Sequence, residues 1–346
     1  MSSRSRRQFL WLSAGAGGAV AVGALVSGKA RQHGGGDRPP RAGGETPRAV
    51  RRTCRAFGSA VTLSAVHDDP DVARRAIDHA FVELEAIESL MSIYRPDSAL
   101  SRLNRDGVLA EADPRLREVL SCAHRLSQES DGAFDVTVQP LWNHFRRAEQ
   151  AGRLPLGEEI EAARSRIDWR GIGVSGSTVR LKRGVELTLN GIAQGYACDR
   201  VADVFRRHGV SDALIDTGEI GALGSKGAGD PWTVGIQDPR RDDAFVCLAQ
   251  LAGRFLATSG DYATAFTPDR ANHHLFDPHT GRSANAFASV SIAARSGMEA
   301  DALSTAVFVS GEERGLRLVL DTPGADALFV RKDGSIAATP GFPLAS

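Results

Sequence analysis

The segment LTLNGIAQGYACDR, residues 187–200, is the most informative part of this chain. An apolar, strand-like run breaks at Gly191, turns through Gly195 and enters an amphipathic helix. A glycine turn lets the backbone approach a ligand closely, and the helix that follows directs its free N–H groups and positive dipole end at an anion. The glycine spacing fits neither the Walker pattern nor the Rossmann fingerprint, so an ordinary strand-to-helix turn explains this segment equally well on its own.

Composition excludes some classes of function. The 346 residues include 42 Lys+Arg and 42 Asp+Glu, so no net charge favours binding to nucleic acid. Apolar residues make up 42% and aromatic residues only 6%, which predicts a sizeable α/β core built from Ala, Val and Leu. No internal stretch is long and apolar enough to cross a bilayer, so we expect no integral membrane protein once a leader is removed.

The N-terminus is typical of a twin-arginine export signal. SRRQFL, residues 5–10, precedes a glycine-rich apolar run over residues 11–26. A permanent membrane anchor is less favoured, because the run is shorter than the roughly 20 residues of a spanning helix and is diluted by glycine. We expect residues 1–30 to be removed after Ala30 and the mature protein to act in the periplasm.

Residues 31–52 lack periodic hydrophobicity and are rich in Gly and Pro, which predicts a flexible linker outside the fold. The folded domain is expected over residues 53–343. Its cysteines include no CxxC pair, so free, buried thiols are favoured over a zinc site or a disulfide. They are Cys54, Cys122, Cys198 and Cys247.

The remaining pattern predicts the mixed α/β, or α+β, class, in one large domain or two. Apolar spacing and capping residues indicate three helices: residues 70–91, a helix that begins at Asp113-Pro114, and residues 298–309, which Gly311 ends. Alternation indicates strands over residues 60–66, 213–216, 232–237, 245–251 and 287–293.

Asp301 and Thr305 lie four residues apart on the last predicted helix and therefore project from one face. A carboxylate and a hydroxyl directed at one point suit Mg²⁺, which prefers hard oxygen ligands. For the pair alone, an Asp favoured by the helix dipole and a Thr bonded to backbone is the preferred explanation. A nearby anion-facing segment changes this preference, because Mg²⁺ usually completes its shell with phosphate oxygens and water.

A third region combines ATSGDY, residues 257–262, with HHLFDPHTG, residues 273–281. In an extended segment His273 and His274 point to opposite faces, which does not indicate a histidine metal site. One of them can face a pocket and serve as the base for a hydroxyl nucleophile. The DPHTG residues predict a tight turn.

Two further segments have no chemistry that their residues alone reveal. MSIYRPDSALSRLN, residues 91–104, is consistent with a helix end followed by a loop. DGAFDVTVQPL, residues 131–141, is consistent with a turn and a short strand that proline closes.

Taken in order, these motifs resemble the ApbE family, the FAD:protein FMN transferases, from about Phe57 to Gly311. The fifth motif is SVSIAARSGMEADALSTAVFVSG, residues 289–311. The resemblance implies a single T-fold-type flavin-transferase domain that uses FAD and Mg²⁺. It also implies that a threonine hydroxyl of an acceptor protein attacks the pyrophosphate, so that FMN is esterified to the threonine and AMP leaves.

The resemblance implies roles for individual residues. The metal ligands are Asp301, Thr305 and the backbone carbonyl of Ala193, and His274 is the base that takes the threonine proton. The implied FAD contacts are Phe57, Ser98, Ala99, Leu100, Ala133, Phe134, Asp135, Asn190, Tyr196 and Leu275. The implied acceptor is a flavoprotein of a membrane-associated electron-transfer system; the export signal is similar to that of relatives that serve the regulator of nitrous oxide respiration.

The chain departs from the family pattern at three places. Gln194 stands where a lysine is common, Gly218-Glu219 where a glycine pair is common, and His273 where a serine is common. Glu219 is either a second metal ligand or part of an altered loop, and both interpretations stay open. The alternatives to a transferase are a Mg²⁺-dependent FAD pyrophosphatase and a periplasmic FAD carrier without catalytic activity.

Overall fold

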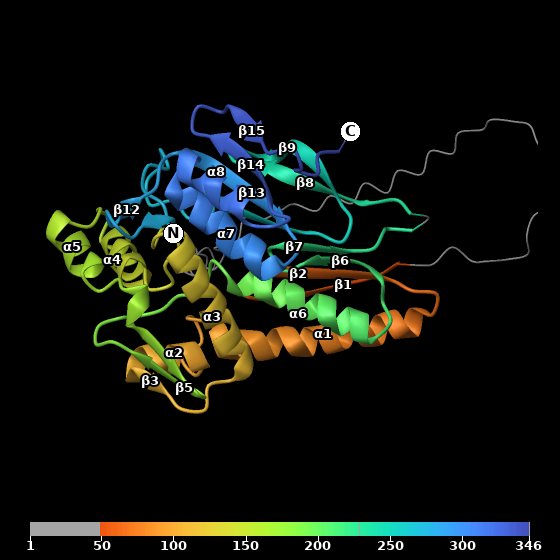
Figure 1. Cartoon of the computed structure of the whole chain (residues 1–346), viewed down its shortest axis with the longest axis horizontal. Coiled ribbons are helices and arrows are strands. Elements are labelled where there is room, and N and C mark those ends of the chain that lie inside the picture. Colours follow the sequence, from red (N-terminus) through yellow and green to blue (C-terminus); the bar gives the residue numbers. More distant parts are fainter. Residues whose placement is uncertain (1–48, 228, 346) are drawn as a thin grey trace, which may run out of the picture.

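The computed structural model describes residues 49–227 and 229–345. The predicted signal peptide and most of the predicted linker lie outside the described residues. An eight-stranded antiparallel sheet organises the described part (Figure 1). Its strands in spatial order are β1 (Ala49–Ala56), β2 (Ser59–Val66), β6 (Asp212–Asp216), β7 (Ile220–Leu223), β10 (Phe255–Gly260), β13 (Phe287–Ala294), β14 (Asp326–Arg331) and β15 (Ile336–Ala338).

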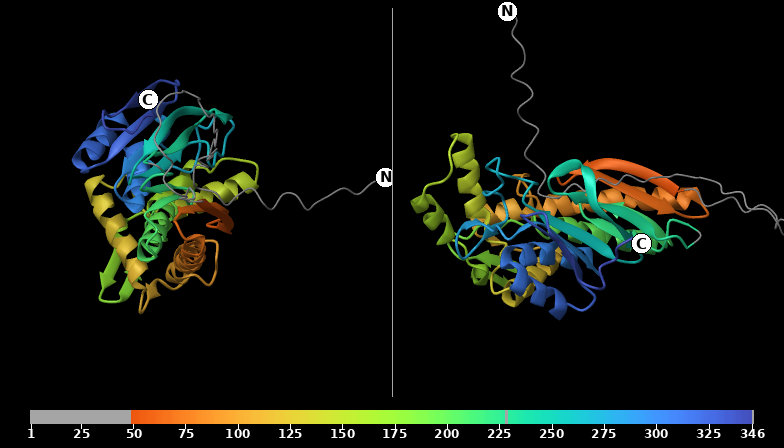
Figure 2. Two further views of the ribbon diagram at one scale, coloured as in Figure 1. Left: turned by 90° about the vertical axis from the view of Figure 1, so that its right-hand side faces the viewer. Right: turned by 90° about the horizontal axis from the view of Figure 1, so that it is seen from above.

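Four helices cover one face of this sheet in the same order as the strands beneath them (Figures 1 and 2). They are α1 (Pro70–Met91), α6 (Ala193–Arg207), α7 (Gly297–Ser310) and α8 (Glu312–Asp321). The hairpin of β8 (Trp232–Asp238) and β9 (Arg241–Leu251) packs with a second apolar cluster. Ile215 joins the helix-side core and its neighbour Leu214 joins this second cluster, because successive strand residues point to opposite faces.

Smaller elements flank the end of the sheet where the cavity described below lies. They are α2 (Ala99–Asp106), β3 (Val108–Leu109), α3 (Pro114–Glu129), α4 (Gln139–Gln150), α5 (Gly157–Arg164), the 3-10 turn η1 (Trp169–Gly171), β4 (Ile172–Ser175), β5 (Thr178–Leu181), β11 (Phe276–Asp277) and β12 (Arg282–Ser283). Within the described residues, no helix combines the length and apolar character that a membrane span requires. The mixed α/β class predicted from sequence is confirmed.

Local sequence explains where the predicted helices begin and end. Asp69 accepts the backbone N–H of Asp71 and is followed by proline, so α1 runs over the predicted residues 70–91. Asp113 caps α3 in the same way. Gly311, with a φ of 76°, ends α7 as predicted.

Three predictions of local structure are wrong. Residues 49–52 do not belong to a linker, because they pair with β2 as the start of β1. Residues 131–141 form turns and then the start of α4, because Pro140 lies in the first helical turn, where its missing N–H costs nothing. β9 begins at Arg241 rather than at residue 245.

The segment 187–200 also differs from its prediction. Residues 187–189 form no strand, and α6 begins at Ala193, so Gly195 lies inside the first helical turn. The four cysteines are free, as predicted, although only Cys198 is fully buried.

Candidate active site

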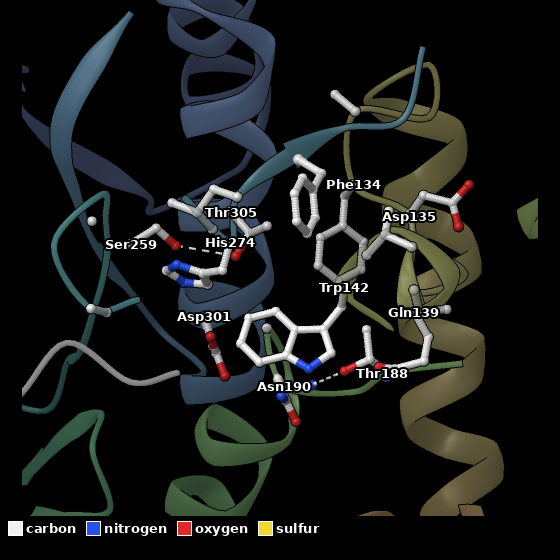
Figure 3. Close-up of a pocket in the computed structure, with 18 of the residues that line it drawn as sticks. Phe134, Asp135, Gln139, Trp142, Thr188, Asn190, Ser259, His274, Asp301 and Thr305 are labelled. Carbon is white, nitrogen blue, oxygen red and sulfur yellow. Dashed lines mark hydrogen bonds between the residues drawn. The ribbon is translucent and has the colours of Figure 1, made fainter. Parts of the chain in front are cut away.

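A cavity lies between the end of the sheet, the N-terminal half of α7 and the start of α4 (Figure 3). The empty space within it, counted together with the open solvent at its mouth, is about 870 Å³. The polar residues that line it are Asp135, Gln139, Thr188, Asn190, Glu219, Thr258, Ser259, His274, Asp301 and Thr305. Apolar lining comes from Ala133, Phe134, Val136, Val138, Trp142, Ala263, Leu275 and Phe276, and glycine backbone from Gly191 and Gly260.

Helix α7 places Asp301 and Thr305 on the wall of this cavity, one helical turn apart (Figure 3). Its start is held by Asp199 of α6, whose carboxylate accepts the backbone N–H groups of Gly297 and Met298 and the hydroxyl of Ser296. A carboxylate at a helix N-terminus satisfies free N–H groups and interacts favourably with the dipole. Asp199 therefore fixes α7, and with it Asp301, relative to α6.

The two helices approach each other closely at two glycines. A Cβ on Gly195 would lie 2.1 Å from the carbonyl oxygen of Gly297, and a Cβ on Gly297 would lie 2.5 Å from the carbonyl oxygen of Gly195. The backbone N–H of Gly195 donates to Oδ2 of Asp301 at 2.9 Å. Gly195 thus allows helix contact and supplies one N–H to a buried carboxylate, rather than making the turn expected from sequence.

Two buried carboxylates, Asp301 and Glu219, face the same cavity. Glu219 accepts the backbone N–H of Thr258 at 3.1 Å. Burial raises the pKa of both carboxyl groups, and the negative charge of Asp301 raises the pKa of Glu219 further. No Lys or Arg is among the described residues that line the cavity. Burial and repulsion thus disfavour two negative charges here, and a bound cation would stabilise both carboxylates in their charged form.

A group of hydroxyls surrounds Thr305. The Ser259 hydroxyl lies 3.1 Å from the Thr305 hydroxyl and 2.8 Å from the hydroxyl of Ser304 (Figure 3). A Cβ on Gly191 would lie 3.0 Å from Oγ1 of Thr305, so the backbone of residue 191 passes close to this hydroxyl. Gly191 therefore lines the cavity beside Thr305, whereas the strand predicted before it is not formed. A close approach of its backbone to a ligand stays a prediction.

The two neighbouring histidines have different environments, as predicted. The carbonyl of Ala284 accepts from Nε2 of His273 at 2.8 Å, while Nδ1 of His273 accepts the N–H of Leu275. His274 lines the cavity, and its Nδ1 lies 3.3 Å from the carbonyl oxygen of Thr264, which can only accept. Nδ1 therefore carries the proton and Nε2 is an acceptor. Burial lowers the pKa of His274 to about 4, so the ring is neutral near pH 7.

Helix α4 forms the opposite wall with Gln139 and Trp142 (Figure 3). The indole of Trp142 packs edge-on against Phe266, with ring centroids 5.9 Å apart. Asn190 contributes from the 187–192 segment, and its Nδ2 donates to the hydroxyl of Tyr94 at 3.4 Å. One side of the cavity therefore presents aromatic rings and amides, and the opposite side presents carboxylates, hydroxyls and an imidazole.

Eight of the site residues predicted from sequence line the cavity, as does Glu219. His274, Asp301, Thr305, Ala133, Phe134, Asn190 and Leu275 line the cavity. Asp135 also lines it, but its carboxylate accepts the N–H and hydroxyl of Thr137 and so stabilises its own turn. Burial raises the pKa of Asp135 to about 6.

Other predicted residues lie outside the described lining of the cavity. Ala193 is the first residue of α6, and Tyr196 is buried with its hydroxyl donating to Glu118. Ser98 caps α2, whose first residues Ala99 and Leu100 are buried in the core. Phe57 lies in the β1–β2 turn with a φ of 52°, where its N–H donates to Glu88.

Several lining residues were not identified from sequence. Gln139 and Trp142 lie on a helix that the pattern did not predict, and Thr188 and Ser259 fall within two of the quoted motifs but were given no role there. Pro140 was the available signal, because proline in the first turn marks a helix start as well as a strand end.

Gln194, where a lysine was expected, does not face the cavity. Its Nε2 donates to the carbonyl of Thr217 at 2.9 Å, and the Thr217 hydroxyl donates to the carbonyl of Gln194 at 3.1 Å. This reciprocal pair holds the loop that carries Glu219.

Comparison with known proteins agrees with this geometry. The model of the ApbE family matches residues 57–329. The FAD:protein FMN transferase of Treponema pallidum is 34% identical over 294 residues, covering 77% of this chain and 80% of the relative. That of Vibrio cholerae is 35% identical over 246 residues, covering 67% and 72%. The crystal structure of the ApbE protein of Thermotoga maritima superposes with a TM-score of 0.77 at 30% identity, covering 85% of this chain and 97% of that one.

The fold and these relatives define an enzyme of the transferase class. Within that class, the chain belongs to the ApbE family.

Proposed function

We propose that this enzyme is a Mg²⁺-dependent FAD:protein FMN transferase, which attaches FMN through a phosphoester bond to a threonine of an acceptor protein and releases AMP. One observation carries the proposal. Asp301, Thr305 and His274 converge on a single cavity that has no Lys or Arg in its described lining. The names of the bacterial relatives support transfer of FMN from FAD to a protein.

The residues fit a magnesium ion. Asp301 and Thr305 offer hard oxygens from one helix face, and Glu219 adds a second buried carboxylate beside them. We assign Asp301 and Thr305 as ligands, together with the backbone carbonyl of Ala193 at the start of α6. When bound, Mg²⁺ neutralises pyrophosphate charge and stabilises the charge that develops on the transferring phosphoryl group. Without such a cation, two carboxylates would repel the diphosphate.

His274 has the protonation state that a base needs. The contact of its Nδ1 with the Thr264 carbonyl leaves Nε2 as an acceptor, and the neutral ring can take a proton near pH 7. In the proposed step, the threonine Oγ forms a bond to the FMN phosphorus and its proton passes to Nε2. The P–O bond of the pyrophosphate breaks, and AMP departs with the bridging oxygen.

We place FAD along the cavity, with its diphosphate beside Asp301 and His274 and one ring system toward α4. Ala133, Phe134, Asn190 and Leu275 are the FAD contacts retained from the sequence in this placement. Asp135 contributes through its turn. Phe57, the Ser98–Leu100 stretch and Tyr196 act indirectly, by packing the elements that bound the cavity.

We further propose that the enzyme acts in the periplasm after twin-arginine export and that its acceptor is a flavoprotein of a membrane-associated electron-transfer system. The arginine pair at residues 6 and 7 and the apolar run after it support this location. Fractionation of cells that produce the full chain checks the location. Substitution of both arginines by lysine should keep the protein in the cytoplasm.

Intact-protein mass spectrometry tests the reaction. The full chain is incubated with FAD, Mg²⁺ and an acceptor domain that carries a Ser/Thr-Gly-Ala-Thr stretch, the acceptor sequence that the resemblance to the family implies. AMP is quantified in parallel. A mass gain of one FMN with equimolar AMP is the expected result. AMP without a mass gain would indicate a pyrophosphatase, and neither product would indicate a carrier.

A further inference from the structure

An unusual hydrogen-bond chain ends at the aromatic side of the cavity. Gln139 is 7% exposed and its Oε1 is a buried atom for which the described residues supply no hydrogen-bond partner. Its Nε2 donates to Oδ1 of Asn143 at 2.8 Å. Asn143 in turn donates through Nδ2 to Oε2 of Glu186 at 2.9 Å. The other oxygen of Glu186 is paired with Arg166.

The carboxylate of Glu186 fixes which groups donate and which accept along this series of hydrogen bonds. A carboxylate paired with an arginine accepts hydrogen bonds, so the Asn143 amide must direct its NH₂ at Glu186 and its oxygen at Gln139. Gln139 must then direct its NH₂ at Asn143. The atom left over, Oε1 of Gln139, is an acceptor, because the hydrogen-bond network itself settles the orientation of the amide. Gln139 thus lines the cavity and carries a buried oxygen that calls for an N–H or O–H donor.

The neighbourhood of this oxygen indicates the kind of donor. Gln139 and Trp142 are three residues apart on α4 and therefore lie on one face of it, and both line the cavity (Figure 3). An aromatic ring that stacks on the indole would bring its edge beside the amide. A buried acceptor without a partner destabilises the free protein, and a ring N–H would remove that cost on binding.

We propose that Gln139 is a specificity-determining residue that accepts a hydrogen bond from a ring-edge N–H of the bound dinucleotide while Trp142 stacks on the same ring. This inference rests on the proposed function, because it takes FAD as the ligand. FAD offers two such donors, the imide N–H of the isoalloxazine and the exocyclic amine of the adenine. The Glu186–Asn143 pair positions the amide so that it accepts and does not donate.

The chain provides a matched control. Gln237 on β8 also has a buried Oε1 for which the described residues supply no partner, and it does not line the cavity. Gln139→Met and Gln237→Met each remove an unpartnered buried oxygen at similar side-chain length. Gln139→Met also removes the Nε2 donor to Asn143, so the ligand-free protein should melt slightly lower, whereas Gln237→Met should leave the melting temperature unchanged.

Calorimetric titration of the full chain with FAD, ADP and FMN in Mg²⁺ tests the inference. Gln139→Met should raise the Kd for FAD by about fivefold to tenfold, as expected for one lost hydrogen bond, and Gln237→Met should leave it unchanged. The Kd of Gln139→Met should rise for only one of the two halves of FAD. It should rise for ADP if the adenine donates, or for FMN if the isoalloxazine donates.

Two outcomes would overturn the inference while leaving the proposed function intact. One is an unchanged Kd for FAD in Gln139→Met, and the other is an equal loss, or no loss, with both halves. Failure of the unaltered protein to bind FAD would instead overturn the proposed function and the inference together.

Discussion

The backbone N–H of Gly195 donates to Oδ2 of Asp301 at 2.9 Å, and this bond joins α6 to α7 at the wall of the cavity. It places the positive end of α6 against a buried carboxylate, which partly offsets the effect of burial on the pKa of Asp301. Within the protein, the N-terminal end of α6 therefore contacts an anionic side chain, the carboxylate of Asp301. A bound diphosphate would meet the Asp301 carboxylate as well as the helix.

Replacement of Asp301 by Asn should abolish metal-dependent transfer while keeping the fold. We expect the rate of FMN transfer to fall by at least about a hundredfold, because metal stabilisation of the phosphoryl charge contributes several kcal/mol. The amide keeps an oxygen for the Gly195 N–H and removes repulsion from Glu219, so the metal-free protein should melt no lower than the parent. Mg²⁺ should raise the melting temperature of the parent and not of the variant. Rapid transfer by Asp301→Asn in Mg²⁺ would disprove the metal assignment.

Gly195→Ala tests the close approach of the two helices. The added Cβ would lie 2.1 Å from the Gly297 carbonyl oxygen and 2.6 Å from Cβ of Asp301, so α6 and α7 must separate. We expect a loss of unfolding free energy on the order of 3 kcal/mol, measured by urea denaturation, and a loss of transfer activity.

Gly157→Ala is the control for that change. Gly157 begins α5, and a Cβ there meets no atom within 4 Å. This variant should be as stable as the parent or slightly more so, because alanine favours a helix more than glycine. Equal stability of the two glycine variants would show that the helices can separate without cost.

Replacement of His274 by Ala should separate binding from chemistry. The ring is assigned to proton transfer, so transfer to the acceptor should fall by about 10²–10⁴-fold while the Kd for FAD changes little. His279→Ala is the control, because His279 is an exposed residue of the nearby turn. Single-turnover kinetics and FAD titration give the two quantities. A His274 variant that loses FAD binding and transfer in parallel would contradict the assignment.

His273 should make stability depend on pH. Burial lowers the pKa of its imidazole to about 3 in the folded state, whereas the unfolded side chain titrates near its ordinary value of 6.5. Between these values the unfolded chain binds more protons, so the stabilisation is present above about pH 6.5 and is lost as the pH falls toward 3.

One such proton changes the free energy of unfolding by about 1.4 kcal/mol per pH unit. His273→Gln should be less stable at pH 7, where the Ala284 contact is weakened, and should lose stability less steeply on acidification. Urea denaturation at pH 7, 6 and 5 measures both slopes. Parallel slopes in parent and variant would assign the acid sensitivity to other groups.

Local signals in the sequence determined a large part of this fold. The caps at Asp69 and Asp113 and the stop at Gly311 act within one helical turn, and the structure has these helix ends where the sequence predicts them. The four-residue spacing of Asp301 and Thr305 likewise determined that both would face one point, since that relation depends only on helix geometry. The alternation at residues 273 and 274 separated the cavity histidine from the structural one for the same reason.

Contacts between distant segments decided the rest. Gly195 looked like a turn residue because its sequence cannot show that Gly297, about a hundred positions later, comes within contact distance of its backbone. Glu219 lines the cavity because the sheet brings its loop beside α7. The Oε1 of Gln139 is left without a partner because Glu186 orients the amide of Asn143. Short-range periodicity carries no information about such pairings: they depend on how sheet and helices pack, and packing is set by the whole core.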